Sequence, residues 1–199
     1  MGALKTIRIV LWTLVVVAAI GASWIWHVNR PSQIAVAGAP YGAGDYRLVT
    51  HAGEPVDDTI FVGQPSAVFF GFTHCPDVCP TTMGDMQHWF AELGDEGSDL
   101  RAFFVSVDPE RDTPAVLGEY VTWVSDRITG LTGEPAEIEK AIAAWGVHAE
   151  RVPLDDGGYT VNHTASVFLL DKNGEFFGTI AYGENPETAV GKLRRLIAG

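Results

Sequence analysis

The two cysteines of this 199-residue chain lie four positions apart, at Cys75 and Cys79, in the segment GFTHCPDVCPTTM. The C-x-x-C spacing of thiol redox sites and zinc knuckles has one residue fewer between its sulfurs. Paired thiolates are soft ligands that suit Cu(I) or Zn(II), and in an exported domain they also form disulfides. The pair is therefore compatible with a metal site that needs a further ligand, a reactive dithiol, or a structural disulfide.

The elements around the cysteines place them at a strand-to-helix turn. Residues 66–73 form an unbroken apolar run with β-formers, which predicts a strand buried on both faces. Ligand sites in open α/β sheets lie outside the carboxyl ends of strands, and a helix N-terminus lowers thiol pKa values. The pair is thus predicted at a functional edge, in a turn that Pro76 and Pro80 stiffen. The helix is predicted from apolar residues at helical spacing before Gly94: Met83, Met86, Phe90 and Leu93.

A third ligand is available from the histidines, and His163 has the most suggestive position. It lies in YTVNHTASVFLLD, two residues before the apolar strand expected at residues 165–170. In a thioredoxin-like fold this connection passes over the cysteine turn, and here it contains no proline. His74 adjoins Cys75, so its side chain is expected to point away and to influence the thiol through its charge. The other histidines are interpreted as structural or surface residues: His27, His51, His88 and His148.

Four further side chains near the cysteines have both a chemical and a structural interpretation. Met83 and Met86 carry thioethers that bind Cu(I), but their spacing also fits the buried face of the helix, and we favour core packing. Asp77 lies between the cysteines, and Asp108 ends a predicted strand in VSVDPERDTP; both are candidates for the outer shell of the site. The alternatives are an exposed turn residue for Asp77 and a capping residue for Asp108.

The predicted fold class is α/β, a thioredoxin-like domain with a central mixed sheet, helices on both faces and an N-terminal hairpin, preceded by one transmembrane helix. Buried strands that alternate with amphipathic helices are typical of such a sheet. Thr113 with Pro114, and Asn185 with Pro186, are typical of helix starts. The expected elements are a hairpin at 46–50 and 59–61, strands at 66–73 and 101–107, helices at 113–124 and 134–145, an extended segment at 147–153, strands at 165–170 and 175–181, and a helix from 185 to 197.

The N-terminal segment is predicted to anchor the chain in a membrane. Residues 9–26 carry no charge and span roughly 27 Å as a helix, close to the ~30 Å hydrocarbon core of a bilayer. Tryptophans stand where a cleavable signal peptide needs small residues, so an uncleaved anchor is favoured. The predicted organisation is an N-terminus at 1–8, a transmembrane anchor at 9–28, a flexible linker at 29–45 and the thioredoxin-like domain at 46–199.

Charge predicts the orientation of the chain and limits its partners. Lys5 and Arg8 precede the apolar run, so the positive-inside rule leaves the N-terminus in the cytoplasm and exports the domain. A single-pass protein of the bacterial inner membrane with a periplasmic domain is favoured over the mitochondrial intermembrane space, because no Arg- and Ser-rich transit peptide is seen. All 25 acidic residues follow the apolar run, which argues against nucleic acid as a partner and favours a basic protein or a cation.

The motifs GFTHCPDVCPTTM, SVDPERDTP and YTVNHTASVFLLD, in this order behind an N-terminal anchor, resemble the Sco/SenC family of cytochrome c oxidase assembly proteins. The likeness extends over residues 63–197. It implies that Cys75, Cys79 and His163 bind one copper per domain, as Cu(I), Cu(II) or both. It also implies a metallochaperone that assists assembly of the binuclear copper (CuA) site of oxidase subunit II. Ligation requires reduced thiols, so a copper donor and a thiol reductant are implied as further partners.

An enzyme is the main alternative within the same resemblance. A thiol-disulfide oxidoreductase would use a redox-active disulfide between Cys75 and Cys79 to reduce the copper-ligand cysteines of subunit II, or cysteines of other exported proteins. A peroxide-reducing relative of the fold is a third possibility, but the sequence lacks the Thr-x-x-Cys arrangement of peroxiredoxins.

Overall fold

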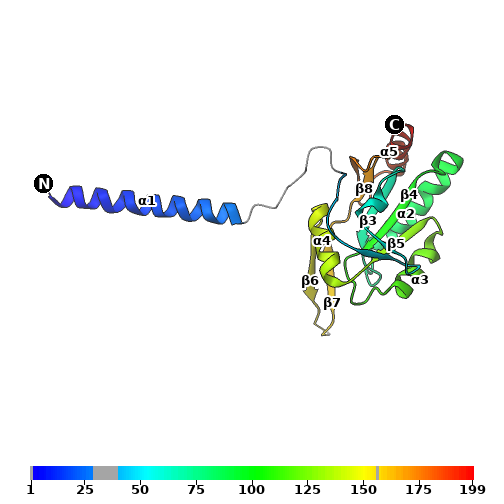
Figure 1. The fold of residues 1–199 in the computed structure, drawn as a ribbon, viewed down its shortest axis with the longest axis horizontal. Coiled ribbons are helices and arrows are strands. Elements are labelled where there is room, and N and C mark those ends of the chain that lie inside the picture. Colours follow the sequence, from blue (N-terminus) through cyan, green and yellow to red (C-terminus); the bar gives the residue numbers. More distant parts are fainter. Residues whose placement is uncertain (1, 29–39, 156) are drawn as a thin grey trace. The chain divides into compact units, whose positions relative to one another are not determined.

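The computed structural model describes residues 2–28, 40–155 and 157–199 (Figure 1). The chain divides into two compact units, Met1–Ala37 and Gly38–Gly199, which are described separately. In the first unit, α1 (Gly2–Val28) is a continuous helix over the run predicted as an anchor. Over the residues described, no helix is both long enough and apolar enough to cross a membrane. The predicted linker lies outside the described residues from 29 to 39.

The second unit is built on a mixed sheet, as predicted. In the part of the chain that the structure describes, its seven strands are β1 (Leu48–Thr50), β2 (Pro55–Val56), β3 (Ser66–Gly71), β4 (Arg101–Ser106), β5 (Ile128–Thr132), β8 (Val167–Leu170) and β9 (Phe176–Ile180). They lie in the order β2-β1-β5-β4-β3-β8-β9. The three central strands run parallel, and β1 and β8 flank them in the antiparallel sense. Every residue of β3 is buried, because it lies at the centre with both faces covered.

Helices cover both faces of this sheet. They are α2 (Val78–Leu93), α3 (Pro114–Val124), α4 (Pro135–Trp145) and α5 (Pro186–Ala198), with short 3-10 turns η1 (Asp58–Phe61) and η2 (Gly94–Gly97). On one face, Trp145 of α4 packs against the rings of Phe70 and Phe168. On the other, Tyr120 of α3 packs against Phe104, and α2 contacts both α3 and α5. The strand β3 is therefore shielded from water on both sides, and α2 begins beside the carboxyl end of β3, where the Cys79 side chain lies against Gly71. Figure 1 shows the helices around the sheet.

Two strands form a separate antiparallel pair outside the main sheet, in the described residues. They are β6 (Ala149–Pro153) and β7 (Tyr159–His163). The extended segment predicted at 147–153 contains β6, but the sequence pattern did not predict β7 as a strand. Its register pairs Ala149 with His163 and Pro153 with Tyr159.

One other expectation about strands was wrong, and one further strand was not predicted. The N-terminal hairpin exists, but its second strand is β2, and residues 59–61 belong to η1 instead. Asp57 caps that turn, because its carboxylate accepts from the Thr59 N–H at 3.1 Å and from the Thr59 hydroxyl at 2.6 Å.

The strand β5 was not predicted, because its threonines and Gly130 interrupt the apolar pattern that indicates a buried strand. It forms through parallel pairing with β4.

Residues 40–45 belong to the folded unit, although the sequence assigns them to the linker. The Tyr41 N–H donates to the Gly174 carbonyl at 2.7 Å, and the Tyr41 ring meets the Trp145 ring edge-on. Gly42 has φ +75° and lies so close to the indole that an added Cβ would come within 2.3 Å of it. Only glycine fits both requirements, so this segment is built to pack on the domain.

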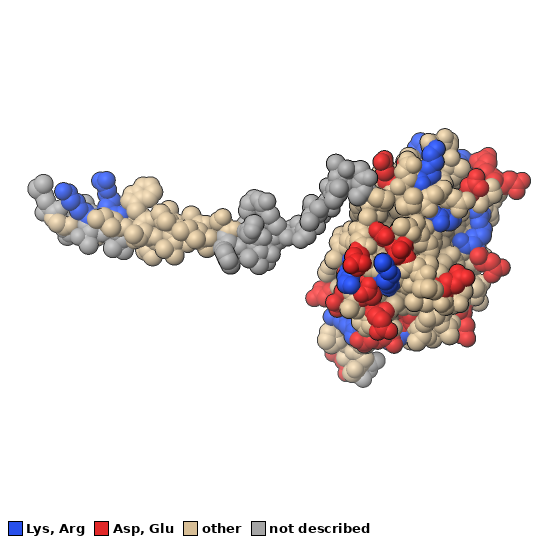
Figure 2. All heavy atoms as spheres, in the orientation of Figure 1, with Lys and Arg blue, Asp and Glu red and all other residues tan. Residues whose placement is uncertain are grey.

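The surface of the folded unit carries acidic and basic side chains side by side. Figure 2 shows Asp and Glu spread over this face, with Lys and Arg between them. The ion pairs include Arg194 with Glu96 at 3.2 Å and Lys140 with Glu137 at 2.6 Å. Exposed pairs of this kind contribute little stability, and a surface rich in charged side chains favours solubility.

The predicted N-cap of α3 is confirmed and supports a stability prediction. Thr113 has extended backbone geometry, and its hydroxyl accepts from the Val116 N–H at 3.4 Å, with Pro114 as the first helical residue. Thr113→Ala is expected to lower the free energy of unfolding by about 1 kcal/mol, measured by urea denaturation. Thr122→Ala in the same helix is the control, because Thr122 only bonds back to the Gly118 carbonyl. Equal losses in both variants would contradict a capping role.

Candidate metal centre

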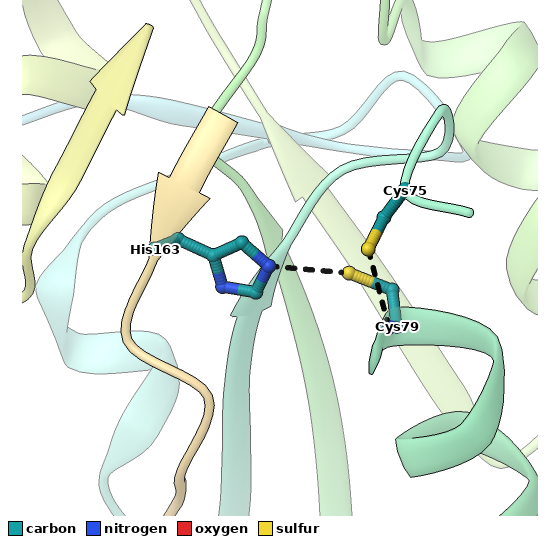
Figure 3. A group of neighbouring side chains, drawn as sticks. All are labelled: Cys75, Cys79 and His163. Atoms are coloured by element: carbon teal, nitrogen blue, oxygen red, sulfur yellow. Dashed lines mark hydrogen bonds between the residues drawn. The ribbon is translucent and has the colours of Figure 1, made fainter. Parts of the chain in front are cut away.

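The two cysteines lie where the sequence places them, in the turn between β3 and α2 (Figure 3). Cys79 is the second residue of α2 and is fully buried, whereas Cys75 is half-buried in the preceding loop. The Cys79 N–H donates to the Cys75 sulfur at 3.4 Å. Both thiols are free in this structure. The helix N-terminus therefore faces the Cys75 sulfur with a backbone donor, which favours its thiolate form.

His163 approaches the thiols from the opposite side of the site. It is the last residue of β7, and its Nε2 lies 3.4 Å from the Cys79 sulfur (Figure 3). Its Nδ1 lies 3.0 Å from the Thr164 carbonyl oxygen. A carbonyl only accepts, so Nδ1 carries the hydrogen and Nε2 presents its lone pair toward the sulfur. This is the arrangement in which a histidine binds a metal through one nitrogen while the backbone orients the other.

The geometry of the three side chains suits a single soft metal ion. The two sulfurs and a ring nitrogen of His163 all lie within 4.8 Å of one another. An ion with bonds of ~2.0–2.3 Å separates trigonal ligands by about 4 Å, so small side-chain movements would close such a site. Two thiolates and one imidazole suit Cu(I), Cu(II) or Zn(II), and a fourth position would remain open.

The environments of the two sulfurs push their pKa values apart. The hydrogen bond with Cys79 is the main reason that the pKa of Cys75 falls to about 4, and backbone N–H groups of Cys79 and Asp77 act in the same direction. That hydrogen bond, followed by burial, raises the pKa of Cys79. At neutral pH Cys75 is therefore a thiolate, while Cys79 keeps its proton between the other sulfur and the imidazole.

Gly71 leaves room for the Cys79 sulfur, which leads to a second prediction. A Cβ at Gly71 would lie 2.8 Å from that sulfur and 3.0 Å from the ring of Phe104. Gly71→Ala is therefore expected to displace Cys79 and to weaken Cu(I) binding about tenfold, measured by competition with a chromophoric chelator. Gly84→Ala is the matched control, because a Cβ at Gly84 of α2 meets nothing within 4 Å. Unchanged affinity in the Gly71 variant would show that the sulfur has space to spare.

Asp112 supports the cysteine loop, a role that sequence reasoning missed. Its buried carboxylate accepts from the Thr73 hydroxyl at 2.6 Å, the Thr73 N–H at 3.1 Å and the Ser106 hydroxyl at 2.6 Å. Burial raises the pKa of Asp112, while these donors oppose the increase. The carboxylate thus ties the residues before Cys75 to the end of β4. Its only sequence signal is its place in SVDPERDTP, the motif in which sequence reasoning selected Asp108 instead.

Asp77 and Asp108, the two predicted outer-shell candidates, lie in different surroundings. Asp77 is exposed and makes no side-chain cap to α2 in the described residues, but its N–H reaches the Cys75 sulfur. Asp108 is fully buried and binds Arg111 and the Tyr159 hydroxyl. The structure gives it no contact with Cys75, Cys79 or His163 among the described residues. Met83 and Met86 are fully buried in the hydrophobic core, as the packing interpretation predicts.

The other histidines lie away from the three side chains, apart from His74. The His74 ring contacts the Thr73 hydroxyl at 3.1 Å and is exposed beside Cys75. His51 accepts from the Gly130 N–H at 3.0 Å, so it joins β1 to β5. His88 and His148 are exposed, and the side chain of His27 lies outside the described residues.

Comparison with known proteins gives a consistent family assignment. The SCO1/SenC family model matches residues 35–198. Human mitochondrial protein SCO1 homolog is 38% identical over 151 residues, which cover 74% of this chain and 50% of the human protein. The SCO2-like protein of Rickettsia felis is 33% identical, over 72% of this chain and 71% of that protein. The chain therefore spans about half the length of the human relative.

Solved structures show the same fold. The structure of Bradyrhizobium japonicum ScoI with copper bound matches with a TM-score of 0.71 and 40% identity, covering 77% of this chain and 98% of that chain. The crystal structure of yeast Sco1 with copper bound matches with a TM-score of 0.72 and 29% identity, covering 79% and 88%. The motifs, the fold and these matches agree, and the chain belongs to the SCO1/SenC family.

Proposed function

We propose that this protein is a copper metallochaperone that binds one copper ion through Cys75, Cys79 and His163. The observation that carries this proposal is the convergence of the two sulfurs and the imidazole nitrogen within 4.8 Å, with Nδ1 held by a backbone carbonyl. Two relatives with the same fold have structures with copper bound, at 40% and 29% identity. The soft donor set accommodates Cu(I), and the imidazole also suits Cu(II).

The thiol chemistry provides a control on copper capture. Copper ligation needs both sulfurs reduced, and a disulfide between Cys75 and Cys79 would remove both from the site. An oxidising compartment favours that disulfide, so loading would depend on an external thiol reductant. Copper capture and release would then follow the redox state of the pair.

The proposed recipient is the binuclear copper site of cytochrome c oxidase subunit II. Support comes from membership of the SCO1/SenC family and from the metal-binding geometry of the site. A site with an open coordination position allows an incoming ligand to bind copper before the first ligands leave. The copper donor and the reductant are further partners that the chemistry requires.

We also propose that residues 9–28 anchor the chain in a bacterial inner membrane, with the N-terminus in the cytoplasm and the domain in the periplasm. Support comes from the sequence: eighteen uncharged residues at 9–26, preceded by Lys5 and Arg8. Insertion of the full chain into vesicles, followed by protease treatment from outside, tests this orientation. Cleavage within α1 would show that lipid does not protect this helix, and it would contradict the proposed anchor.

A thiol-disulfide oxidoreductase is the second candidate, and the lowered pKa of Cys75 favours it. A half-buried thiolate at a helix N-terminus attacks disulfides readily. This function requires both cysteines but not His163. Turnover of a disulfide substrate that survives His163→Ala would therefore support the oxidoreductase over the chaperone.

Metal analysis of the full chain in detergent tests the leading proposal. The reduced protein is expected to retain about one copper per chain after gel filtration, and the protein oxidised to the Cys75–Cys79 disulfide is expected to retain almost none. Equal copper contents in the reduced and oxidised proteins, or no copper in either, would contradict the proposal.

A further inference from the structure

The position of His163 depends on how the β6–β7 pair is attached to the domain. This pair lies outside the seven-stranded sheet in the described residues, so no ladder of that sheet holds it. Three of the five β6 residues are exposed. Because His163 is the last residue of β7, any displacement of the pair would move its imidazole away from Cys79.

A buried charged cluster joins this strand pair to the end of β4. Asp108 is fully buried, and its carboxylate pairs with the Arg111 guanidinium and accepts from the Tyr159 hydroxyl at 2.8 Å. Arg111 in turn donates to the Tyr159 carbonyl at 3.1 Å, and its guanidinium lies 3.9 Å from the centre of the Tyr159 ring. Both the backbone and the side chain of the first β7 residue are therefore bound by this cluster.

The neighbouring strand is attached at the same place. Arg151 of β6 forms an ion pair with Glu110 at 2.9 Å, and its guanidinium lies 4.8 Å from the centre of the Tyr159 ring. Tyr159 is thus held between two arginines, one from the β4–α3 connection and one from β6. The cluster attaches β7 at the end that is far from His163, and β6 at its middle residue, Arg151, which pairs with Val161.

Two routes connect the cluster to the imidazole. Side chains alternate along a strand, so Tyr159, Val161 and His163 share one face of β7, with Tyr159 and His163 about 13 Å apart along the strand. Val161, between them, is buried and secures this face. On the second route, Arg111 lies 5.7 Å from the Phe72 ring centre, and that ring meets the His163 ring edge-on at 5.8 Å.

We propose that Asp108, Arg111 and Tyr159 are positioning residues for His163, which hold β7 so that the imidazole meets the Cys79 sulfur. They act through the strand and, for Arg111, through the Phe72 ring; within the part of the chain that the structure describes, they make no direct contact with Cys75, Cys79 or His163. The expected effect on copper affinity rests on the proposed function, whereas the expected effect on the position of the His163 ring does not. Asp108 therefore influences the site indirectly, by holding the β6–β7 pair in place.

The first test measures the His163 ring in the metal-free full chain. The ring lies edge-on to Phe69 and Phe72, at 5.9 and 5.8 Å, so its proton NMR shifts report on those aromatic neighbours. Arg111→Met is expected to move the His163 ring shifts toward those of the exposed His148, while His51 keeps its shifts as a reference for the intact fold. Unmoved His163 shifts in a folded Arg111→Met protein would overturn the proposal.

A matched control separates positioning from general loss of stability. Arg127 also stacks on an aromatic ring, Phe90, at 4.5 Å, and also donates to a carbonyl, that of Gly97. Arg127→Met is expected to leave the His163 shifts unchanged at equal or greater loss of thermal stability. Where Arg111→Met fails to fold, Tyr159→Phe replaces it, because it removes only the hydroxyl contact to Asp108. Equal effects of the Arg111 and Arg127 variants would contradict the proposal.

The second test is a double-mutant cycle on Cu(I) affinity. Arg111→Met and Tyr159→Phe are each expected to weaken binding, about tenfold for the arginine variant, when His163 is present. Neither is expected to weaken it further in a His163→Ala background, because the residue they position is gone. Equal losses in both backgrounds would overturn the proposal. If the wild-type chain binds no copper, the proposed function fails, and the ring shifts alone decide the positioning role.

Discussion

Cu(I) affinity is expected to fall at least about 100-fold when Cys79 is replaced by serine or His163 by alanine. Changes to groups that merely orient a metal ligand typically cost 10–100-fold, so loss of a ligand costs at least the upper end of that range. Cys79→Ser substitutes a hard hydroxyl for a soft thiolate at a fully buried position. His163→Ala removes the nitrogen that lies 3.4 Å from the Cys79 sulfur. Competition with a chromophoric Cu(I) chelator measures both affinities.

His148→Ala is the matched control for the histidine variant. His148 lies next to β6, exposed, and its ring is 3.7 Å from the Glu150 carboxylate and so faces away from the thiols. Its removal is expected to change copper affinity less than twofold. A His163 variant that binds copper as tightly as wild type would show that the two sulfurs suffice, and the three-ligand site would have to be abandoned.

The alkylation rate of Cys75 is expected to stay nearly constant between pH 8 and pH 5.5. Its pKa of about 4 keeps it deprotonated over this range. Because the pKa of Cys75 is lowered, its thiolate, and with it the alkylation rate, is lost only as the pH falls through about 4. An ordinary thiol with a pKa of about 8.5 is ~0.1% thiolate at pH 5.5, and its rate falls a few hundredfold over the same range. Iodoacetamide labelling of the reduced apo protein, quantified by peptide mass spectrometry, measures the profile.

Cys79→Ala tests the cause of this low pKa. The hydrogen bond with the Cys79 thiol makes the largest contribution, so its removal is expected to raise the pKa of Cys75 and to shift the labelling profile to higher pH. Cys79 itself is expected to react slowly throughout, because it is buried and its pKa is raised. A tenfold fall in Cys75 labelling for each pH unit below 8 in the wild-type protein would contradict this account.

The parts of the fold that were predicted correctly are those encoded locally. The apolar run at 66–73 identifies β3, because a strand that is buried on both faces has apolar residues at consecutive positions. The apolar spacing before Gly94 identifies α2, because a helix that is buried on one face has apolar residues every three to four positions. Thr113 and Asn185 were recognised as caps because a cap involves residues only three positions apart. For the same reason the cysteine turn could be placed between a strand and a helix without the structure.

The missed elements depend on partners that are distant in the sequence. The residues of β5, ITGLT, have a weak pattern, and they form a strand because β4 on one side and β1 on the other supply hydrogen bonds. Residues 40–45, at the start of the folded unit, were assigned to the linker because glycine and alanine are common there, yet Tyr41 and Gly42 fit against Trp145, more than 100 positions away. Side-chain packing of this kind leaves no local period in the sequence.

The sequence by itself determined the candidate donor atoms of the site: two thiols predicted in a stiff turn at a helix N-terminus, and an imidazole just before a central strand that the family resemblance adds to them. Only the tertiary structure decided how these atoms meet, since the 3.4 Å contact between Cys79 and His163 joins residues 84 positions apart. The same holds for protonation, because the Thr164 carbonyl and the buried Cys79 thiol set which nitrogen and which sulfur carry hydrogen. Residue types follow from the sequence, but distances and pKa values depend on neighbours that folding brings together.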